Sequence, residues 1–272
     1  MSYSLAQVNA AVQTLWPDSG AEEWDAGGPV SGDPAAEVAR VNLVVDVVND
    51  TVDEAVTAGA DLIIAHHPLL LRGVSSVYQD RYKGALLAKL IRADCALISA
   101  HTSADVVADG VSDVLAQRLG LLETEPIVPG RNAGTGIGRS GRLAEPTTVG
   151  RLARELAAML PATASGVRVA GDYAAPVRTI ALCGGAGDSL LRERAVVASD
   201  AFITADLRHH PASEAREQFR LVGGPALIDV SHWASEWLWL DTAAAQLTAA
   251  LPELSVQVSD LRTDPWDFVV VQ

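Results

Sequence analysis

Short apolar runs alternate with helical patterns along the first half of the chain, and this alternation limits the fold more than any other feature. Residues 40–48 and 61–65 have the Val, Ile and Leu content of buried strands, and residues 50–60 between them have helical spacing. A second such succession, helix then strand then helix, covers residues 82–121. Strands that alternate with helices form β-α-β units, so the sequence predicts an α/β fold.

The alternation breaks at residues 123–141, which are rich in Gly and Pro and lack a helical period. We expect a boundary between two lobes there, in a chain long enough for two domains of ordinary size. Helices and strands resume beyond it, with a Gly-rich turn at 184–188. Helices are expected at 148–160, 211–219 and 236–251, and strands at 166–171, 177–183, 201–206, 226–231 and 254–260.

The charge balance excludes two classes of partner. The formal net charge is −14 and the chain has no basic run, so general nucleic-acid binding and anionic membrane surfaces are disfavoured. No apolar run reaches the roughly 18 residues of a membrane span. The start of the sequence lacks the basic segment of a signal peptide, and Ser4 with Gln7 forms a capping box instead. We therefore expect a cytoplasmic protein, in which Cys95 and Cys183 are buried free thiols.

Every histidine of the chain follows a strand-like run. In open α/β sheets, ligands bind beyond the carboxyl ends of the strands. Packing alone does not explain why the whole histidine complement gathers at such positions. The histidines are His66, His67, His101, His209, His210 and His232.

Carboxylates accompany the histidines at useful spacings. Asp105 lies four residues after His101, and Glu236 lies four residues after His232, on the same face of a helix that begins there. A mixture of imidazole and carboxylate suits zinc, iron or manganese. Five ligands exceed the need of one tetrahedral ion and suit about two ions that share a bridging carboxylate. The candidate metal ligands are His66, His67, Asp105, His232 and Glu236.

Plainer interpretations exist for each ligand motif. His66 and His67 could be solvated imidazoles in a turn that ends the strand. His232 and Glu236 alone would be equally well explained as a hydrogen-bonded pair at the start of a helix. Asp105 alone would be an ordinary turn former.

The remaining polar motifs are less specific. His101 could be a ligand, a partner of a ligand or a substrate contact, and we favour the last two roles. His209 and His210 fit a surface pair before a helix opened by Pro211 as well as a site. The glycines of residues 183–188 could hold a phosphate, although a tight turn explains them equally well.

Several motifs occur together and in order along nearly the whole chain. With them, the sequence resembles the Nif-three-like dinuclear metal-centre family, whose members are often labelled GTP cyclohydrolase I type 2. The motifs are EEWDAGGPVSGDP, ADLIIAHHPLL, ISAHTSAD, GIGRSGRLAEP, RTIALCGGAGDSL, ITADLRHHPA and LIDVSHWASE.

The resemblance implies two α/β lobes with mixed sheets flanked by helices and a dinuclear metal site in the cleft between them. Residues 1–128 plus 229–272 would form one lobe and residues 129–228 the other, without the inserted domain of some longer relatives. A homohexamer is expected. The same five ligands follow by position, with Glu236 as the bridge. The family's usual Asn-Leu is replaced here by Ser103 and Ala104, a departure that removes no ligand.

The resemblance also implies an activity. We expect a metal-dependent hydrolase that acts on a nucleotide or a related phosphorylated heterocycle, with two ions of zinc, iron or manganese that activate water. In the GTP cyclohydrolase reaction, this water would attack C8 of the purine, and His101 or His210 would carry the proton. The alternatives are a metal-loaded regulatory scaffold without turnover and a two-metal phosphoesterase.

Overall fold

A computed structural model describes residues 2–271, which form two compact units. The first unit contains the residues up to Ala104 together with Leu240–Thr263, and the second contains Asp105–Trp239 together with the residues from Asp264 onward. The first unit thus joins the N-terminal residues to the late segment Leu240–Thr263. These bounds differ from the expected lobes of 1–128 plus 229–272 and of 129–228, because residues 105–128, 229–239 and those from Asp264 onward belong to the second unit.

The first unit is built on a five-stranded mixed sheet in the order β15-β4-β5-β6-β2. The strands β15, β4, β5 and β6 run parallel, and β2 is antiparallel at the edge. A separate two-stranded sheet pairs β1 with β3. The strands are β1 (Tyr3–Ser4), β2 (Gly28–Ser31), β3 (Glu37–Val38), β4 (Arg40–Val44), β5 (Leu62–Ala65), β6 (Ala96–Ser99) and β15 (Ser255–Val258).

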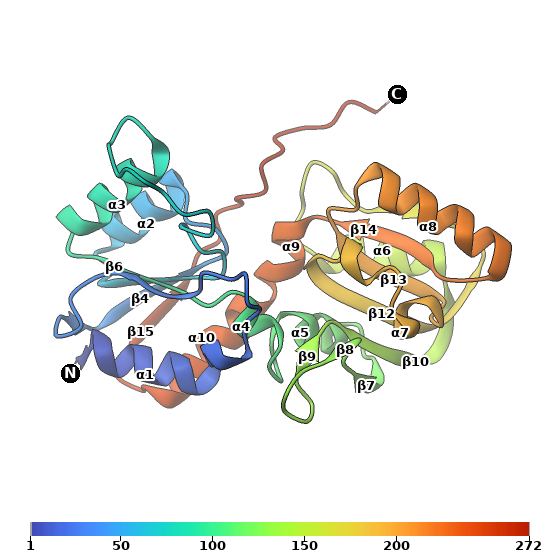
Figure 1. The fold of residues 1–272 in the computed structure, drawn as a ribbon, viewed down its shortest axis with the longest axis horizontal. Helices are drawn as coiled ribbons and strands as arrows, with labels where there is room; N and C mark the ends of the chain where they lie inside the picture. The colour runs from blue at the N-terminus through green and yellow to red at the C-terminus, as the bar shows by residue number, and fades with distance from the viewer. Residues whose placement is uncertain (1, 272) are drawn as a thin grey trace. The chain divides into compact units, whose positions relative to one another are not determined.

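Helices cover both faces of this sheet, which explains why its central strands are apolar throughout (Figure 1). On one face, Ile63 and Leu97 pack with Leu90 of α3 in a buried cluster. Ser4 caps α1 through the expected capping box with Gln7. The helices are α1 (Leu5–Leu15), η1 (Asp18–Gly20), α2 (Asn49–Ala58), α3 (Tyr82–Arg92), α4 (Thr102–Asp105, at the boundary) and α10 (Trp239–Ala250).

The second unit is built on a six-stranded mixed sheet in the order β11-β14-β13-β12-β10-β7. The strands β12, β13 and β14 are parallel, and the others are antiparallel to their neighbours. A separate two-stranded sheet pairs β8 with β9. The strands of the second unit are β7 (Leu122–Glu125), β8 (Val128–Pro129), β9 (Gly136–Ile137), β10 (Arg139–Thr148), β11 (Arg168–Ala170), β12 (Pro176–Ala186), β13 (Ala201–Ala205) and β14 (Ala226–Val230).

Helices flank this sheet as well. Phe219 of α8 packs against Phe202 and Ala181 of the sheet in a second buried cluster. The observed architecture of two α/β units with mixed sheets confirms the predicted fold class. The helices of the second unit are α5 (Val111–Arg118), α6 (Val149–Met159), η2 (Asp188–Leu190), α7 (Arg194–Val197), α8 (His209–Val222) and α9 (His232–Trp237).

The segment 123–141, where a boundary between two lobes was expected, lies inside the second unit. Its strands β7 and β10 complete one side of the six-stranded sheet. Arg139 is buried and donates from Nε to Asp113 of α5 at 2.9 Å, and Ser112 accepts a hydrogen bond from the amide of Gly184 at 3.2 Å. These contacts explain why α5 belongs to the second unit.

Two further expectations are corrected. The glycines Gly184 and Gly185 lie within β12 rather than in a turn, and the strand bulges between Leu182 and Ala186. The single helix expected at 236–251 is divided at Leu238 into α9 and α10.

The structure also bears on the two cysteines and on whether a helix could cross a membrane. Cys95 and Cys183 are buried free thiols, as predicted. Burial raises the pKa of each thiol to about 12. Among residues 2–271, no helix has the length and apolar character needed to cross a membrane.

Candidate metal centre

Three parallel strands of the first unit end side by side, and each is followed by an ionisable residue. The register pairs Val44 of β4 with Ala65 of β5, and Ala65 with Ser99 of β6. His66 and His67 directly follow β5, and their amides donate to carbonyls at the end of β4 at 2.9 and 2.8 Å. Parallel pairing therefore places these histidines beside Asp46, which follows β4, and His101, which follows β6.

The three histidine rings of the first unit form a tight group. Their ring centroids lie 5.1 to 5.6 Å apart. One ring nitrogen from each lies within 4.8 Å of the others, so the group could hold a metal ion. His66 is fully buried, whereas His67 and His101 are partly exposed. The sequence favoured His101 as a partner of ligands, but its position allows it to be a ligand too.

In each of these rings, Nδ1 is hydrogen-bonded to an oxygen atom. His66 Nδ1 lies 3.0 Å from the carbonyl oxygen of Ala100. His67 Nδ1 lies 2.8 Å from Asp46 Oδ1, and His101 Nδ1 lies 2.8 Å from Asp25 Oδ1. Because carbonyl and carboxylate oxygens accept, Nδ1 carries the proton and Nε2 keeps its lone pair.

Hydrogen bonds from His101 and Thr102 fix the Asp25 carboxylate. Burial by itself raises the pKa of this group. The hydrogen bonds from His101 and Thr102 outweigh burial and hold the pKa well below its usual range. A second Asp25 oxygen accepts from both the amide and the hydroxyl of Thr102. Asp25 therefore remains a carboxylate at neutral pH and fixes the His101 ring.

The second unit presents a comparable group at the ends of β13 and β14. Asp206 follows β13, and His232 opens α9 after Ser231, whose hydroxyl caps the helix by accepting from the amide of Ala234 at 3.2 Å. His232 Nδ1 lies 2.8 Å from Asp206 Oδ2, and His232 Nε2 lies 2.9 Å from Glu236 Oε1. The helical spacing thus brings the predicted His232–Glu236 pair together.

Gly185 of β12 lies close to His232 and Glu236. A Cβ at Gly185 would lie 2.4 Å from Glu236 Oε1 and 3.2 Å from His232 Nε2. The residue has a φ of +67°, and its amide donates to Ser235 Oγ at 2.9 Å. Only a residue without a side chain leaves the Glu236 carboxylate and the His232 nitrogen open at this point.

The charges of this group reinforce one another. Burial lowers the pKa of His232, but Glu236 and Asp206 outweigh it and raise the pKa well above its ordinary value. The hydrogen bond from His232 lowers the pKa of Asp206. Without a metal ion, the imidazolium form of His232 is therefore stabilised by two carboxylates. A divalent cation would meet the same negative surroundings.

Asp105 lies at the end of α4, and its charge affects the same part of the second unit as the charge of Glu236 does. Apart from burial, the carboxylates that raise the pKa of Cys183 are Asp105 and Glu236. Both charges therefore act on this one thiol, which lies two residues before Gly185 in β12. Asp105 and Glu236 therefore lie in the same part of the second unit. The role of Asp105 as a ligand stays a prediction.

The donor set of each unit fits a transition-metal ion. The first group offers imidazole nitrogens from His66, His67 and His101. The second combines the His232 nitrogen with the Glu236 carboxylate, beside Gly185, where a Cβ would collide with that carboxylate. A histidine that binds a metal ion through one ring nitrogen usually donates a hydrogen bond from the other to a carboxylate or carbonyl oxygen. The predicted ligands therefore have suitable partners, although number and identity of the ions remain predictions.

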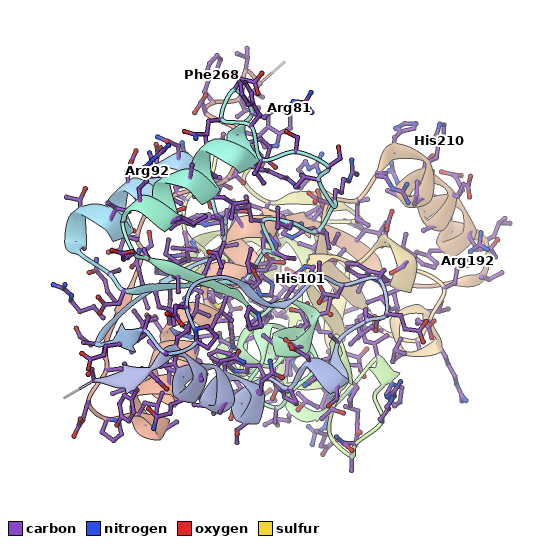
Figure 2. All side chains as sticks on the ribbon, turned by 60° about the vertical axis from the view of Figure 1, so that its left-hand side comes forward. Arg81, Arg92, His101, Arg192, His210 and Phe268 are labelled. Atoms are coloured by element: carbon purple, nitrogen blue, oxygen red, sulfur yellow. The ribbon has the colours of Figure 1, made fainter. Side chains whose placement is uncertain are left out.

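His209 and His210 occupy a different position. Both lie exposed in the first turn of α8, with ring centroids 5.1 Å apart, and His210 projects from this helix (Figure 2). A surface pair at the start of a helix was one of the two sequence-based interpretations. The role of His210 in catalysis stays a prediction.

The sequence analysis did not identify the carboxylates that hold the histidines. Asp46 and Asp206 follow strands in the same way as the histidines do, so the strand-end rule would have found them. Asp25 follows no such rule. It lies 76 residues from its partner His101, and only the EEWDAGG motif drew attention to it.

Comparison with known families gives one match over nearly the whole chain. Residues 3–265 match the family described as Duf34/NIF3 (NGG1p interacting factor 3). A Streptomyces coelicolor protein named GTP cyclohydrolase 1 type 2 homolog is 49% identical, and the alignment covers 96% of this chain and 93% of that protein. A Mycobacterium tuberculosis protein of the same name is 32% identical, with 98% and 97% covered.

Solved structures share the fold over nearly the whole chain as well. The crystal structure of a Bacillus cereus protein related to NIF3 superposes with a TM-score of 0.88 at 23% identity, and covers 98% of this chain and 99% of that one. Staphylococcus aureus protein SA1388 gives a TM-score of 0.86 at 25% identity, with the same coverage. The fold of the whole chain is therefore shared with these proteins.

Proposed function

Since the chain belongs to the Duf34/NIF3 family, we propose that it is a metal-dependent hydrolase of a nucleotide or a related phosphorylated heterocycle. The proposed cofactor is a pair of divalent ions, for which zinc, iron and manganese are the candidates. The proposed ligands are His66, His67, Asp105, His232 and Glu236.

The observation that carries this proposal is the way the strand-end histidines are held. Oxygen atoms lie 2.8 to 3.0 Å from Nδ1 of His66, His67 and His232. For His66 and His67 this arrangement leaves Nε2 as the nitrogen that would bind a metal ion. At His232 a metal ion would replace the proton between Nε2 and Glu236 Oε1, because a ligand imidazole must be neutral. Two divalent ions would exceed the charge of Asp105 and Glu236, so the centre would attract an anionic substrate despite the net charge of −14.

The proposed chemistry divides between the ions and the chain. The ions would supply a water of lowered pKa and positive charge for the substrate. His101 is the proposed proton carrier, because Asp25 fixes its Nδ1 and leaves Nε2 to accept or deliver a proton. His210 is the second candidate for this role. With GTP as substrate, water would add at C8 and open the imidazole ring.

Metal analysis tests the ligand set. Protein purified without added metal is analysed by mass spectrometry, with His67→Ala and Glu236→Ala beside the wild type. We expect about two transition-metal ions per wild-type chain and a clear loss in both variants. His209→Ala removes an exposed histidine and should retain the wild-type content. No stoichiometric metal after reconstitution would contradict the proposal.

Turnover tests the hydrolase assignment separately. We expect metal-loaded protein to convert GTP, and both chelation and Glu236→Gln to abolish conversion. Hydrolysis of a simple phosphoester without conversion of GTP would favour a two-metal phosphoesterase. Bound metal without either activity would favour a regulatory scaffold.

We also propose that the protein assembles as a homo-oligomer, with the homohexamer as the expected form. An apolar C-terminal segment supports association. Trp266, Phe268 and Val271 in this segment are 65%, 79% and 87% exposed in the single chain. Contiguous exposed apolar side chains are unusual on a monomer and mark interaction sites. Light scattering coupled to gel filtration gives the mass directly.

A further inference from the structure

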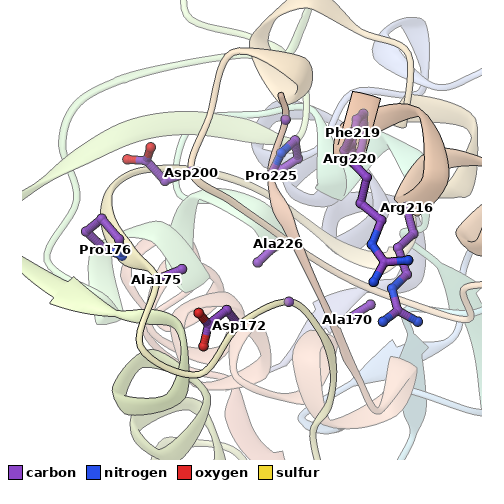
Figure 3. A pocket seen from close by; sticks show the side chains of 12 residues that line it. Ala170, Asp172, Ala175, Pro176, Asp200, Arg216, Phe219, Arg220, Pro225 and Ala226 are labelled. Carbon is purple, nitrogen blue, oxygen red and sulfur yellow. The ribbon is translucent and has the colours of Figure 1, made fainter. Parts of the chain in front are cut away.

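The second unit contains a pocket at the end of its sheet opposite to His232. The pocket lies where β12, β13 and β14 begin, at Pro176, beside Asp200 and at Ala226 (Figure 3). His232 instead follows the carboxyl end of β14. The pocket has a volume of about 540 Å³, which lies within the usual range for small-molecule sites.

Small residues line the floor of the pocket. A Cβ at Gly171 would lie 2.6 Å from the Cβ of Ala226, so β11 and β14 approach closely there. On the wall formed by α8, the ring of Phe219 lies against Gly224, where a Cβ would be 2.4 Å from the ring. Closely packed small residues and the side chain of Phe219 therefore form this part of the pocket lining.

Two arginines of α8 border the pocket. Arg216 and Arg220 are one helical turn apart, and their side chains extend along the same side of the pocket (Figure 3). Like charges at this spacing are mildly destabilising. Among residues 2–271, Arg216 has no ion-pair partner, and Arg220 has only the exposed Glu217 at 3.0 Å. In a chain with a net charge of −14, this pair is suited to an external anion.

Carboxylates border the other side of the pocket. Asp200 Oδ2 accepts from the amides of Arg178 and Thr179 at 2.9 and 2.8 Å. Burial raises the pKa of Asp200, but these hydrogen bonds outweigh it and lower the pKa. Asp172 Oδ1 accepts from the amide of Ala174 at 3.0 Å. Both side chains are thus held in place as acceptors, and the hydroxyl groups of a ligand are suitable donors.

We propose that this pocket binds a phosphorylated small molecule with hydroxyl groups, of the size of a sugar phosphate or a mononucleotide. Arg216 and Arg220 hold the phosphate, and Asp172 and Asp200 accept from the hydroxyls. Phe219 provides an apolar face for the ring of the ligand. This site is separate from the candidate metal ligands, and the inference does not depend on the proposed hydrolase activity.

Calorimetric titration of the full chain tests the inference with three probes: inorganic phosphate, ribose 5-phosphate and GMP. We expect ribose 5-phosphate or GMP to bind more tightly than inorganic phosphate. The double variant Arg216→Ala/Arg220→Ala should weaken binding by roughly 10- to 100-fold, the range for charged hydrogen bonds. Arg192→Ala removes an exposed arginine outside this pocket and should bind as the wild type does.

Two further comparisons separate the parts of the proposal. Asp172→Asn should weaken the binding of ribose 5-phosphate and leave the binding of inorganic phosphate unchanged, because only ribose 5-phosphate has sugar hydroxyls. Each titration is repeated with a chelator, and unchanged binding distinguishes this pocket from a metal site. Tighter binding of GMP than of ribose 5-phosphate would identify the ligand as a nucleotide. Absence of binding by all three probes, or equal binding by the double variant, would overturn the inference.

Discussion

The substitution Gly185→Ala tests the candidate centre at its tightest point. The new Cβ would stand 2.4 Å from Glu236 Oε1, a distance that forces the carboxylate to move. It would also stand 3.2 Å from His232 Nε2, where the ring has little room to yield. The φ of +67° adds a backbone cost of about 1–2 kcal/mol for any residue with a Cβ. We expect metal affinity to fall by roughly 10- to 100-fold, as for other changes that displace a ligand's support.

The chain offers a matched control for this substitution. Gly120 has a φ of +66°, and a Cβ there would meet no atom within 4 Å. Gly120→Ala therefore carries the same backbone cost without the displacement of Glu236. In thermal unfolding of the metal-free protein, Gly120→Ala should show the backbone cost alone and Gly185→Ala should lose more stability, because its Cβ also displaces the buried Glu236 carboxylate. Only Gly185→Ala should lose affinity in a zinc titration. Equal zinc affinity in the two variants would refute the assignment of Glu236 as a ligand.

Three other predictions follow from the same structure. Asp25→Asn should lower turnover and shift the imidazole signals of His101 in NMR spectra, because the ring loses its carboxylate; unchanged spectra would show that Asp25 does not hold the ring. Cys95 and Cys183 should resist a thiol reagent at pH 8 in native protein and react after unfolding, because burial raises each pKa to about 12. Deletion of residues 265–272 should reduce the oligomer mass in light scattering, and an unchanged mass would exclude the apolar segment from the interface.

The sequence by itself was sufficient to place the histidines at the ends of strands. His66 and His67 follow β5, His101 follows β6, and His232 follows β14, as the apolar runs predicted. The reason is local, since a buried strand can be recognised from its own residues and the residue that follows it is then known. The carboxyl ends of parallel strands share one edge of a sheet, which is why the ring centroids of His101 and His66 lie 5.4 Å apart in the structure.

The partners of the histidines were decided by the tertiary structure alone. Asp25 is 76 residues from His101, and Asp206 is 26 residues from His232, so no local pattern links either pair. The close approach of Gly185 to Glu236 likewise results from the packing of α9 against β12, which the spacing of residues in a single segment cannot encode.

The limits of the two units were also decided by tertiary contacts. The glycines and prolines of residues 123–141 suggested a boundary between two lobes, because such residues disfavour helices. In the structure they permit the turns between β7 and β10, while Arg139 fixes this segment to α5 through Asp113. Turn chemistry is local and can be read from the sequence, whereas the sheet that a strand joins depends on partners far along the chain.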